Sequence, residues 1–217
     1  MDINLSGIVI IVGNYGSGKT EVAVNLAIYR KRSGIEVRIG DLDLVNPYFR
    51  TRETKRVLND LGIDVVIPPA QYFHADLPIL TPAIAGMLQS PADVTLLDAG
   101  GDDVGATVLA ALSDKLKGKP VRVLQVVNPF RPFTHTMEGC LKIKQEIEAA
   151  SKLDINGVIG NANLIDDTTA DHIQEGYDFI SAYAAESRCP LEFITAWESL
   201  IPALDSSRFS CPVLPIL

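Results

Sequence analysis

The stretch that decides the fold is Gly13-Asn14-Tyr15-Gly16-Ser17-Gly18-Lys19-Thr20. Its spacing, G-x-x-x-x-G-K-T, is the P-loop pattern, in which glycines let the backbone curl until several N–H groups point at the phosphates of a nucleotide. In this pattern the lysine reaches the β- and γ-phosphates and the threonine hydroxyl holds Mg²⁺. The residues that we predict to contact the nucleotide here are Gly13, Asn14, Tyr15, Gly16, Ser17, Gly18, Lys19, Thr20 and Glu21.

The surroundings of the motif support this prediction. The apolar run 8–12 before it is typical of a buried strand. After it, Val22, Leu26 and Tyr29 recur at helical spacing, and Gly34 follows as a C-terminal cap. A helix that begins near Lys19 directs its positive N-terminal dipole at the bound anion. The alternative is a glycine-rich turn between a strand and a helix that binds no ligand.

Length and composition indicate one globular domain over residues 1–217. With 47% apolar and 21% charged residues, the composition is that of an ordinary folded protein, and no linker-like stretch divides the chain. No apolar segment approaches the roughly 20 residues of a membrane helix, and the N-terminal residues lack the basic region of a secretory signal. We therefore expect a cytoplasmic protein that does not bind membranes.

Charge and cysteine usage exclude other classes. The net charge of −8 disfavours nucleic acid as a partner. The cysteines Cys140, Cys189 and Cys211 lie far apart, and no C-x-x-C or H-x-x-x-H pair suggests a zinc or iron–sulfur site. We expect structural thiols in a reducing compartment.

Short apolar runs rich in Val and Ile alternate with longer amphipathic stretches. The runs lie at 8–12, 37–42, 65–67, 94–97, 121–127, 158–159 and 191–195, and the helical stretches include 52–61, 134–150 and 168–186. Strands that are apolar throughout are buried on both faces. The pattern predicts an α/β protein with a mostly parallel central sheet in a three-layer sandwich, of the P-loop NTPase type. Ligands bind such sheets outside the carboxyl ends of the strands.

A carboxylate ends one of these predicted strands, in Leu96-Leu97-Asp98. A P-loop site needs an acidic side chain at this place to orient Mg²⁺ through its water shell. Gly101 follows, and a glycine there lets the backbone approach a γ-phosphate. We predict that Asp98 belongs to the metal site; the alternative is a residue that only solvates a loop.

Asp41 and Asp43 follow the second predicted strand. A carboxylate here is suited to position or deprotonate the attacking water, while the other supports the hydration of the metal. Asp43 is the better candidate for the base. The metal site then comprises Thr20, Asp41, Asp43 and Asp98, and the catalytic residues are Lys19 and Asp43. The alternative is a pair of exposed aspartates at a turn toward Pro47.

The order of these motifs resembles the MinD/ParA/CobQ-type P-loop ATPases, which include Mrp-like proteins and the nitrogenase iron protein. The resemblance covers nearly the whole chain and implies an ATP-binding protein. It implies that Asp43 handles the hydrolytic water, that residues 98–101 form a switch, and that Asn161 reads adenine. The segment around Trp197 would flank the base, although a tryptophan there is equally expected in a core or an interface.

One position departs from the family pattern. Many members carry a second lysine directly after the first P-loop glycine, which contacts the nucleotide of the partner subunit, and here that residue is Asn14. Asparagine supplies no positive charge, so a lysine acting in trans is not expected. Arg50, Arg52 and Arg131 are candidates to replace it, and each is also explained as a surface cation.

Together these observations predict an ATPase that uses Mg²⁺ and hydrolyses ATP to ADP and phosphate as a switch in regulation or assembly. The sequence leaves the oligomeric state open, with a nucleotide-dependent homodimer as one alternative, and it does not give the identity of a protein partner. Two alternatives remain open. One is an ATP-dependent ligase or kinase of the dethiobiotin synthetase or cobyrinate amidase type. The other is a nucleotide-gated binding module with little turnover.

Overall fold

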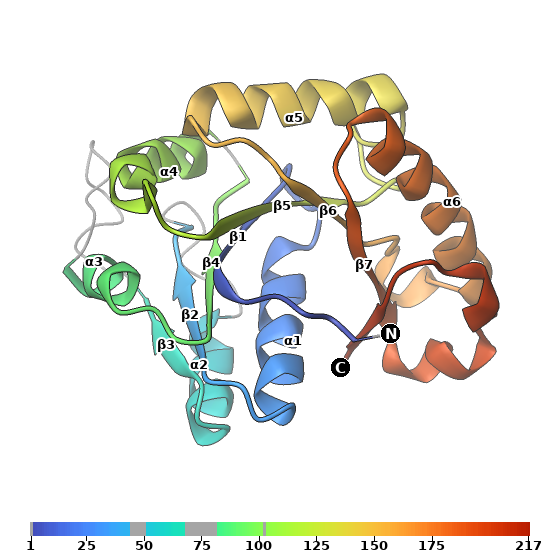
Figure 1. Ribbon diagram of the computed structural model, residues 1–217. Coiled ribbons are helices and arrows are strands. Elements are labelled where there is room, and N and C mark those ends of the chain that lie inside the picture. The colour runs from blue at the N-terminus through green and yellow to red at the C-terminus, as the bar shows by residue number, and fades with distance from the viewer. Residues whose placement is uncertain (1, 44–50, 68–81, 102) are drawn as a thin grey trace.

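The computed structural model describes residues 2–43, 51–67, 82–101 and 103–217 (Figure 1). The strands are β1 (Gly7–Val12), β2 (Val37–Asp41), β3 (Asp64–Val66), β4 (Val94–Asp98), β5 (Val121–Val127), β6 (Gly157–Gly160), β7 (Leu191–Trp197) and β8 (Val213–Ile216). The α-helices are α1 (Lys19–Arg32), α2 (Thr51–Asp60), α3 (Pro82–Gln89), α4 (Asp103–Leu116), α5 (Met137–Ser151) and α6 (Ala170–Glu186). Short 3₁₀ helices η2 (Ile165–Asp167), η3 (Glu198–Ala203) and η4 (Ser206–Arg208) lie among the later elements.

The eight strands of the described residues form one parallel sheet in the order β3-β2-β4-β1-β5-β6-β7-β8. This confirms the predicted parallel sheet. From β1 the chain moves first toward β2 and β3 on one side and later toward β5 through β8 on the other. The carboxyl end of β1 therefore lies where the strand order reverses, which is the usual ligand position in open α/β sheets.

Helices cover both faces of the sheet, as the predicted three-layer sandwich requires (Figure 1). Helices α1 and α2 pack on one face, where Leu26 and Leu58 join Val9 and Ile11 in one buried cluster. Helices α3, α4, α5 and α6 pack on the other, where Leu112 and other apolar side chains form a second cluster. Burial from both sides explains why the central strands are mostly apolar, as in β1, where five of six residues are buried.

Strand β8 was not predicted from the sequence. It pairs with β7 at the edge of the sheet, and its register places Pro215 beside Ala196. Proline lacks a backbone N–H and is tolerated in an edge strand, where one side of the strand needs no partner. Pro212 and Pro215 disfavour a helix at this place, but they do not exclude an edge strand.

Helix α5 begins later than the predicted 134–150. Thr134 is held outside the helix because its Oγ1 donates to the Asn128 carbonyl oxygen at 2.7 Å. Thr136 instead caps the helix, accepting a hydrogen bond from the backbone N–H of Gly139. This side-chain cap fixes the start at Met137. Helices α3 and α4 were not delimited from the sequence either.

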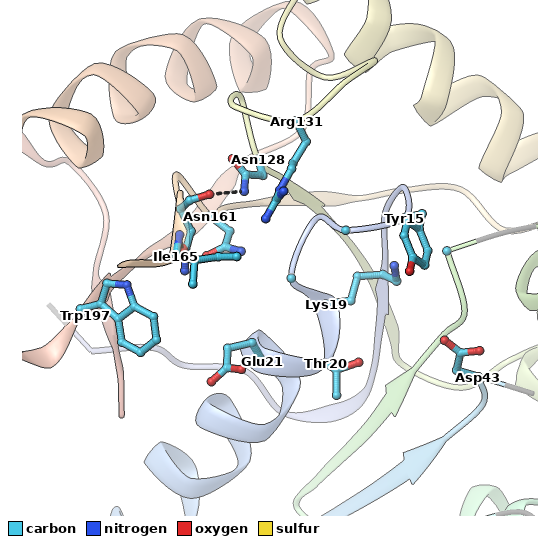
Figure 2. A pocket seen from close by; sticks show the side chains of 14 residues that line it. Tyr15, Lys19, Thr20, Glu21, Asp43, Asn128, Arg131, Asn161, Ile165 and Trp197 are labelled. Carbon is cyan, nitrogen blue, oxygen red and sulfur yellow. Dashed lines mark hydrogen bonds between the residues drawn. The ribbon is translucent and has the colours of Figure 1, made fainter. Parts of the chain in front are cut away.

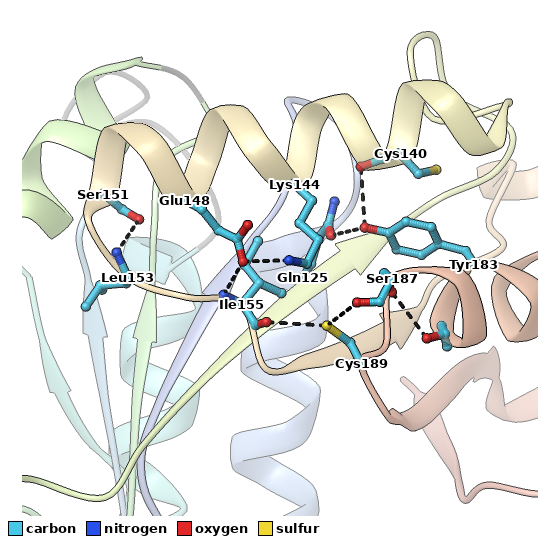
Figure 3. Close-up of polar contacts among 11 residues, drawn as sticks. Gln125, Cys140, Lys144, Glu148, Ser151, Leu153, Ile155, Tyr183, Ser187 and Cys189 are labelled. Atoms are coloured by element: carbon cyan, nitrogen blue, oxygen red, sulfur yellow. Dashed lines mark hydrogen bonds and ion pairs between the residues drawn. The ribbon is translucent and has the colours of Figure 1, made fainter.

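Buried polar contacts hold α5 and α6 against the sheet (Figure 3). The Tyr183 hydroxyl of α6 donates to Gln125 Oε1 of β5 at 2.6 Å and to the Cys140 carbonyl oxygen of α5 at 3.3 Å. Cys189 Sγ donates to the Ile155 carbonyl oxygen at 3.3 Å. Burial raises the pKa of the Cys140 thiol to about 11, so this thiol stays protonated and unreactive at neutral pH. These contacts fit the structural role expected for the thiols.

Within the described ranges, no helix combines the length and the apolar character needed to span a bilayer.

Candidate functional site

The P-loop connects β1 to α1 at the carboxyl edge of the sheet. Gly18 immediately precedes α1 and has φ 92°, in the left-handed region that glycine adopts without strain. A Cβ atom at Gly18 would lie 2.1 Å from Asn161 Nδ2, so a larger residue does not fit. Ser17 N donates to the Asn14 carbonyl oxygen at 3.2 Å and closes the loop. The loop therefore has the tight curl that the motif predicts.

Lys19 is held inside this curl. Its side chain is buried, and Nζ donates to the Asn14 carbonyl oxygen at 3.1 Å. Gly101, after β4, lies against the same group: a Cβ atom there would meet Lys19 Nζ at 2.6 Å and Tyr15 N at 2.9 Å. The segment after β4 thus contacts the P-loop directly, and only glycine permits this approach.

Thr20 and Asp98, both predicted to belong to a magnesium site, are in direct contact. Thr20 Oγ1 donates to Asp98 Oδ2 at 2.6 Å, whereas Asp98 Oδ1 is buried without a hydrogen-bond partner. Asp98 is only 2% exposed, which rules out a residue that merely solvates a loop. A hydroxyl and an unsatisfied carboxylate oxygen beside a phosphate cradle suit Mg²⁺, which binds through one or two protein groups plus phosphate oxygens and water.

The rest of the structure is consistent with such an open site. Among the described residues, no group of three or more His, Cys, Asp and Glu side chains is placed to hold a metal ion by itself. Magnesium in phosphate-binding sites rarely uses such a cage. Thr20 would bind the ion and Asp98 would order its water shell, where the ion would neutralise phosphate charge.

Burial raises the pKa of the Asp98 carboxyl from 3.8 to about 6, against the lowering effects of the Thr20 hydroxyl and of Lys19. Because the folded state then favours the protonated form, Asp98 costs stability as the pH rises through about 6. We expect the ligand-free protein to lose stability relative to Asp98→Asn between pH 4 and 7, by on the order of 2–3 kcal/mol. Urea unfolding of both proteins at several pH values measures this, and parallel pH profiles would contradict it.

Asp41 and Asp43 occupy different places. Asp41 ends β2 beside Asp98 of β4, is buried, and accepts a hydrogen bond from Asp43 N at 2.9 Å. Asp43 lines the cavity in front of the P-loop, whereas Asp41 is not among the lining residues (Figure 2). Asp41 thus shapes the turn that carries Asp43. This arrangement is compatible with the predicted division between a water-handling residue and a supporting residue.

Asn161 lies beneath the P-loop at the end of β6. Its Nδ2 donates to the Ser17 carbonyl oxygen at 2.7 Å, and its Oδ1 accepts from Thr195 Oγ1 at 2.5 Å. Both ends of the amide are thus bonded within the protein, and the residue is 3% exposed. In this conformation Asn161 ties the P-loop to β7, and contact with a base would require it to exchange one of these bonds.

These residues surround one cavity of about 270 Å³ (Figure 2). The P-loop, Asp43 and Gly101 line one end, and the other is lined by residues after β5 and β6 and by the last residue of β7; these are Asn128, Arg131, Asn161, Asn163, Ile165 and Trp197. Trp197 is half-buried, lines the cavity and also packs against the core, so both of its expected roles fit.

Three cavity residues, Asn128, Asn163 and Ile165, received no role from the sequence. Asn128 and Asn163 each follow a strand at the carboxyl edge, which was the available signal, and Asn128 Nδ2 donates to the Asn163 carbonyl oxygen at 2.8 Å. Ile165 had no signal, since nothing in an exposed apolar residue indicates a site. Arg50 and the side chain of Arg52, both candidate cations, lie outside the described residues.

Gly18→Ala tests the tight contact of the P-loop. We expect loss of nucleotide binding and destabilisation by more than the roughly 1–2 kcal/mol of left-handed strain alone, because the new methyl group collides with Asn161. Gly34→Ala is the matched control, since Gly34 has φ 81° but no atom within 4 Å of an added Cβ. Thermal unfolding and calorimetric titration compare the two variants. Equal effects would show that Asn161 does not confine the loop.

Comparison with known proteins adds to this geometry. No protein-family model matches the chain, and no curated protein matches it. Among solved structures, it is similar to signal recognition particle 54 kDa protein from Aeropyrum pernix K1 in complex with GDP, with 20% identity and a TM-score of 0.60 over 89% of this chain and 42% of that one. It is also similar to cell division protein FtsY from Thermotoga maritima, with 22% identity and a TM-score of 0.60 over 91% of this chain and 66% of that one.

A third similar structure is FlhF complexed with GTP and Mg²⁺, with 15% identity and a TM-score of 0.56 over 92% of this chain and 69% of that one. This chain thus spans less than two thirds of the length of the first two proteins. At these identities the likeness concerns the fold alone. The parallel sheet, the flanking helices and these structural neighbours show that the chain has the α/β fold of P-loop NTPases.

Proposed function

We propose that this chain binds a nucleoside triphosphate with Mg²⁺ in the cavity and hydrolyses it to the diphosphate and phosphate. One observation carries the proposal: the P-loop encloses Lys19 while the Thr20 hydroxyl meets a buried, half-satisfied Asp98 carboxylate. A buried carboxylate with a free oxygen is costly unless a ligand compensates it. A hydrated cation at Thr20 is such a ligand.

The residues divide the reaction among them. Water attacks the γ-phosphorus, forming a new P–O bond as the bond to the β,γ-bridging oxygen breaks, and the diphosphate leaves with that oxygen. Asp43 orients the water and takes its proton. Lys19 stabilises the charge on the phosphate oxygens, and the ordered N–H groups of the P-loop do the same. Gly101 lets the segment after β4 approach the γ-phosphate.

The proposed nucleotide is ATP, which rests on the resemblance to MinD/ParA-type ATPases. The solved structures named above include complexes with GDP and with GTP and Mg²⁺, so GTP is the alternative to be tested. Competition of unlabelled ATP and GTP against one fluorescent triphosphate measures the preference. Tighter binding of GTP would overturn the ATP assignment and leave triphosphate hydrolysis in place.

The proposed output is a switch in regulation or assembly, in a cytoplasmic protein that acts on a protein partner rather than on nucleic acid or a membrane. The segments after β2 and β4 carry Asp43 and Gly101, which both line the cavity at the end that we assign to the γ-phosphate. The solution mass of the parent and of Asp43→Ala with and without ATP·Mg²⁺ tests for a nucleotide-dependent homodimer. A mass that never changes, with phosphate release that depends on an added metabolite, would favour a ligase or kinase instead.

A further inference from the structure

Arg131 extends from the loop after β5 into the nucleotide cavity (Figure 2). Its side chain is half-buried, and its Nε atom is buried without a hydrogen-bond partner. Arg131 takes part in none of the ion pairs among the described residues. A guanidinium that is partly withdrawn from water and lacks an anion is suited to bind an anionic ligand.

The loop holds the backbone of Arg131 in place. Arg131 N donates to the Asn128 carbonyl oxygen at 3.2 Å, and Thr134 N donates to the Arg131 carbonyl oxygen at 3.2 Å. The start of α5 packs closely against this loop, since a Cβ atom at Gly139 would lie 2.0 Å from the Phe133 carbonyl oxygen. The backbone that carries the guanidinium is therefore fixed by this turn. Less conformational entropy is then lost when Arg131 binds a ligand.

Asn14 attaches this loop to the P-loop. Its Nδ2 donates to the Pro132 carbonyl oxygen at 3.3 Å, and the side chain is only 9% exposed. The residue at the position of the second P-loop lysine of the resembled family therefore points into its own chain. It links the phosphate cradle to the residue that follows Arg131.

The charge of a bound triphosphate would favour a second cation in the cavity beside Lys19. Lys19 and Arg131 are the cations among the described lining residues, and Glu21 and Asp43 are the carboxylates. These four side chains nearly cancel, whereas a bound triphosphate adds several negative charges. Without Arg131, Lys19 would be the only described cation of the cavity facing them. Guanidinium groups bind phosphate oxygens with two parallel hydrogen bonds.

We propose that Arg131 binds phosphate oxygens of the nucleotide held by its own chain, with Asn14 as its positioning residue. This inference rests on the proposed nucleotide binding. Arg131 then supplies the second positive charge of the site from the same protomer that binds the nucleotide. No cation from a second copy of the chain is needed to neutralise the phosphates.

Calorimetric titration tests the phosphate contact. The ligands are the triphosphate, the diphosphate and the nucleoside of the base that the parent prefers, each with Mg²⁺. We expect Arg131→Ala to weaken triphosphate and diphosphate binding about 10- to 100-fold, as loss of a charged hydrogen bond does, and to leave nucleoside binding unchanged. Arg131→Lys should lose less, because it keeps the charge but not the planar fork. Arg32→Ala, which removes an exposed arginine from the far end of α1, should match the parent.

These titrations distinguish failure of the Arg131–phosphate contact from failure of the proposed nucleotide binding. If the parent binds the triphosphate and Arg131→Ala binds it equally well, the phosphate contact is refuted and the nucleotide site stands. Equal losses for the nucleoside and the triphosphate would show that Arg131 stacks on the base, which also overturns the proposal. A parent that binds no triphosphate would refute the proposed function itself.

Mixing variants tests whether Arg131 acts within its own chain. Lys19→Ala and Arg131→Ala each damage one cation, and we expect equimolar mixtures to show no more phosphate release than the two variants measured separately. If Arg131 acted on the nucleotide of a partner subunit, mixed dimers would contain one site with both cations intact. Recovered activity in the mixture would therefore overturn the assignment to one chain.

A double-mutant cycle tests the positioning role of Asn14. We expect Asn14→Ala to weaken triphosphate binding in the parent but to have little further effect in the Arg131→Ala background, because its contribution passes through Arg131. Independent, additive losses would show that Asn14 acts on the P-loop alone and would remove it from the proposal.

Discussion

Lys19→Ala is expected to reduce triphosphate hydrolysis by at least about 100-fold and to weaken triphosphate binding strongly. Removal of a preorganised donor to the reacting group typically has an effect of this size. Lys19 is 8% exposed, and the P-loop orients its ammonium through the Asn14 carbonyl oxygen. The ammonium is therefore already desolvated and directed before the nucleotide binds, so its contribution is larger than that of a surface lysine.

Phosphate release and calorimetric titration measure the Lys19→Ala effect. Lys117→Ala is the control, because Lys117 is an exposed lysine of the same charge paired with Asp114. It should retain parental binding and hydrolysis. A Lys19→Ala protein that folds as the parent does and still hydrolyses ATP at the parental rate would refute the nucleotide site.

Asp43→Ala is expected to lower the hydrolysis rate about 10²- to 10⁴-fold, the range of general-base contributions, and to leave triphosphate affinity within a few-fold of the parent. Asp43 lines the cavity but supplies no cation to the phosphates. Its removal therefore affects the attacking water and not the binding of the nucleotide. Because Asp43 also raises the pKa of Asp98, its removal should slightly favour the ionised form of Asp98.

Single-turnover hydrolysis with saturating triphosphate separates the two effects of Asp43→Ala. Asp41→Asn is the informative companion, since it alters the residue that holds the turn while keeping an oxygen to accept the Asp43 N–H. We expect a smaller loss of rate for Asp41→Asn. If Asp41→Asn lost the greater part of the activity while Asp43→Ala retained it, the roles of the two aspartates would have to be exchanged.

The sequence was sufficient to predict the parallel sheet and its flanking helices, because buried strands of this kind have a recognisable apolar pattern. The run 8–12 is buried and wholly apolar, and the run 121–127 is buried from Val123 onward and mostly apolar. The P-loop, Asp98 and Gly101 follow from the rule that ligands bind at the carboxyl ends of strands. Strand β8 was missed because Pro212 and Pro215 suggest irregular structure, and only the place of β8 at the sheet edge makes Pro215 acceptable within it.

Hydrogen-bond partners were beyond the reach of the sequence. No pattern indicates that the amide of Asn161 is occupied by Ser17 and Thr195, or that Asn14 binds a carbonyl 118 residues away. For the same reason Arg131 could not be distinguished from an ordinary surface arginine. Its distinction comes from the turn that directs it inward, and that turn depends on contacts between segments far apart in the chain.

The edge strand β8 supports the helix that carries the phosphate-binding residues. Leu217 N donates to Asn25 Oδ1 of α1 at 3.0 Å, and Leu214 and Ile216 share a buried cluster with the same helix. The helix that begins with the phosphate-binding residues thus completes its packing with residues 213–217, which lie far from it in the sequence. A substitution that loosens β8 would therefore be felt at the phosphate cradle through the body of α1, although β8 itself contributes no residue to the cavity.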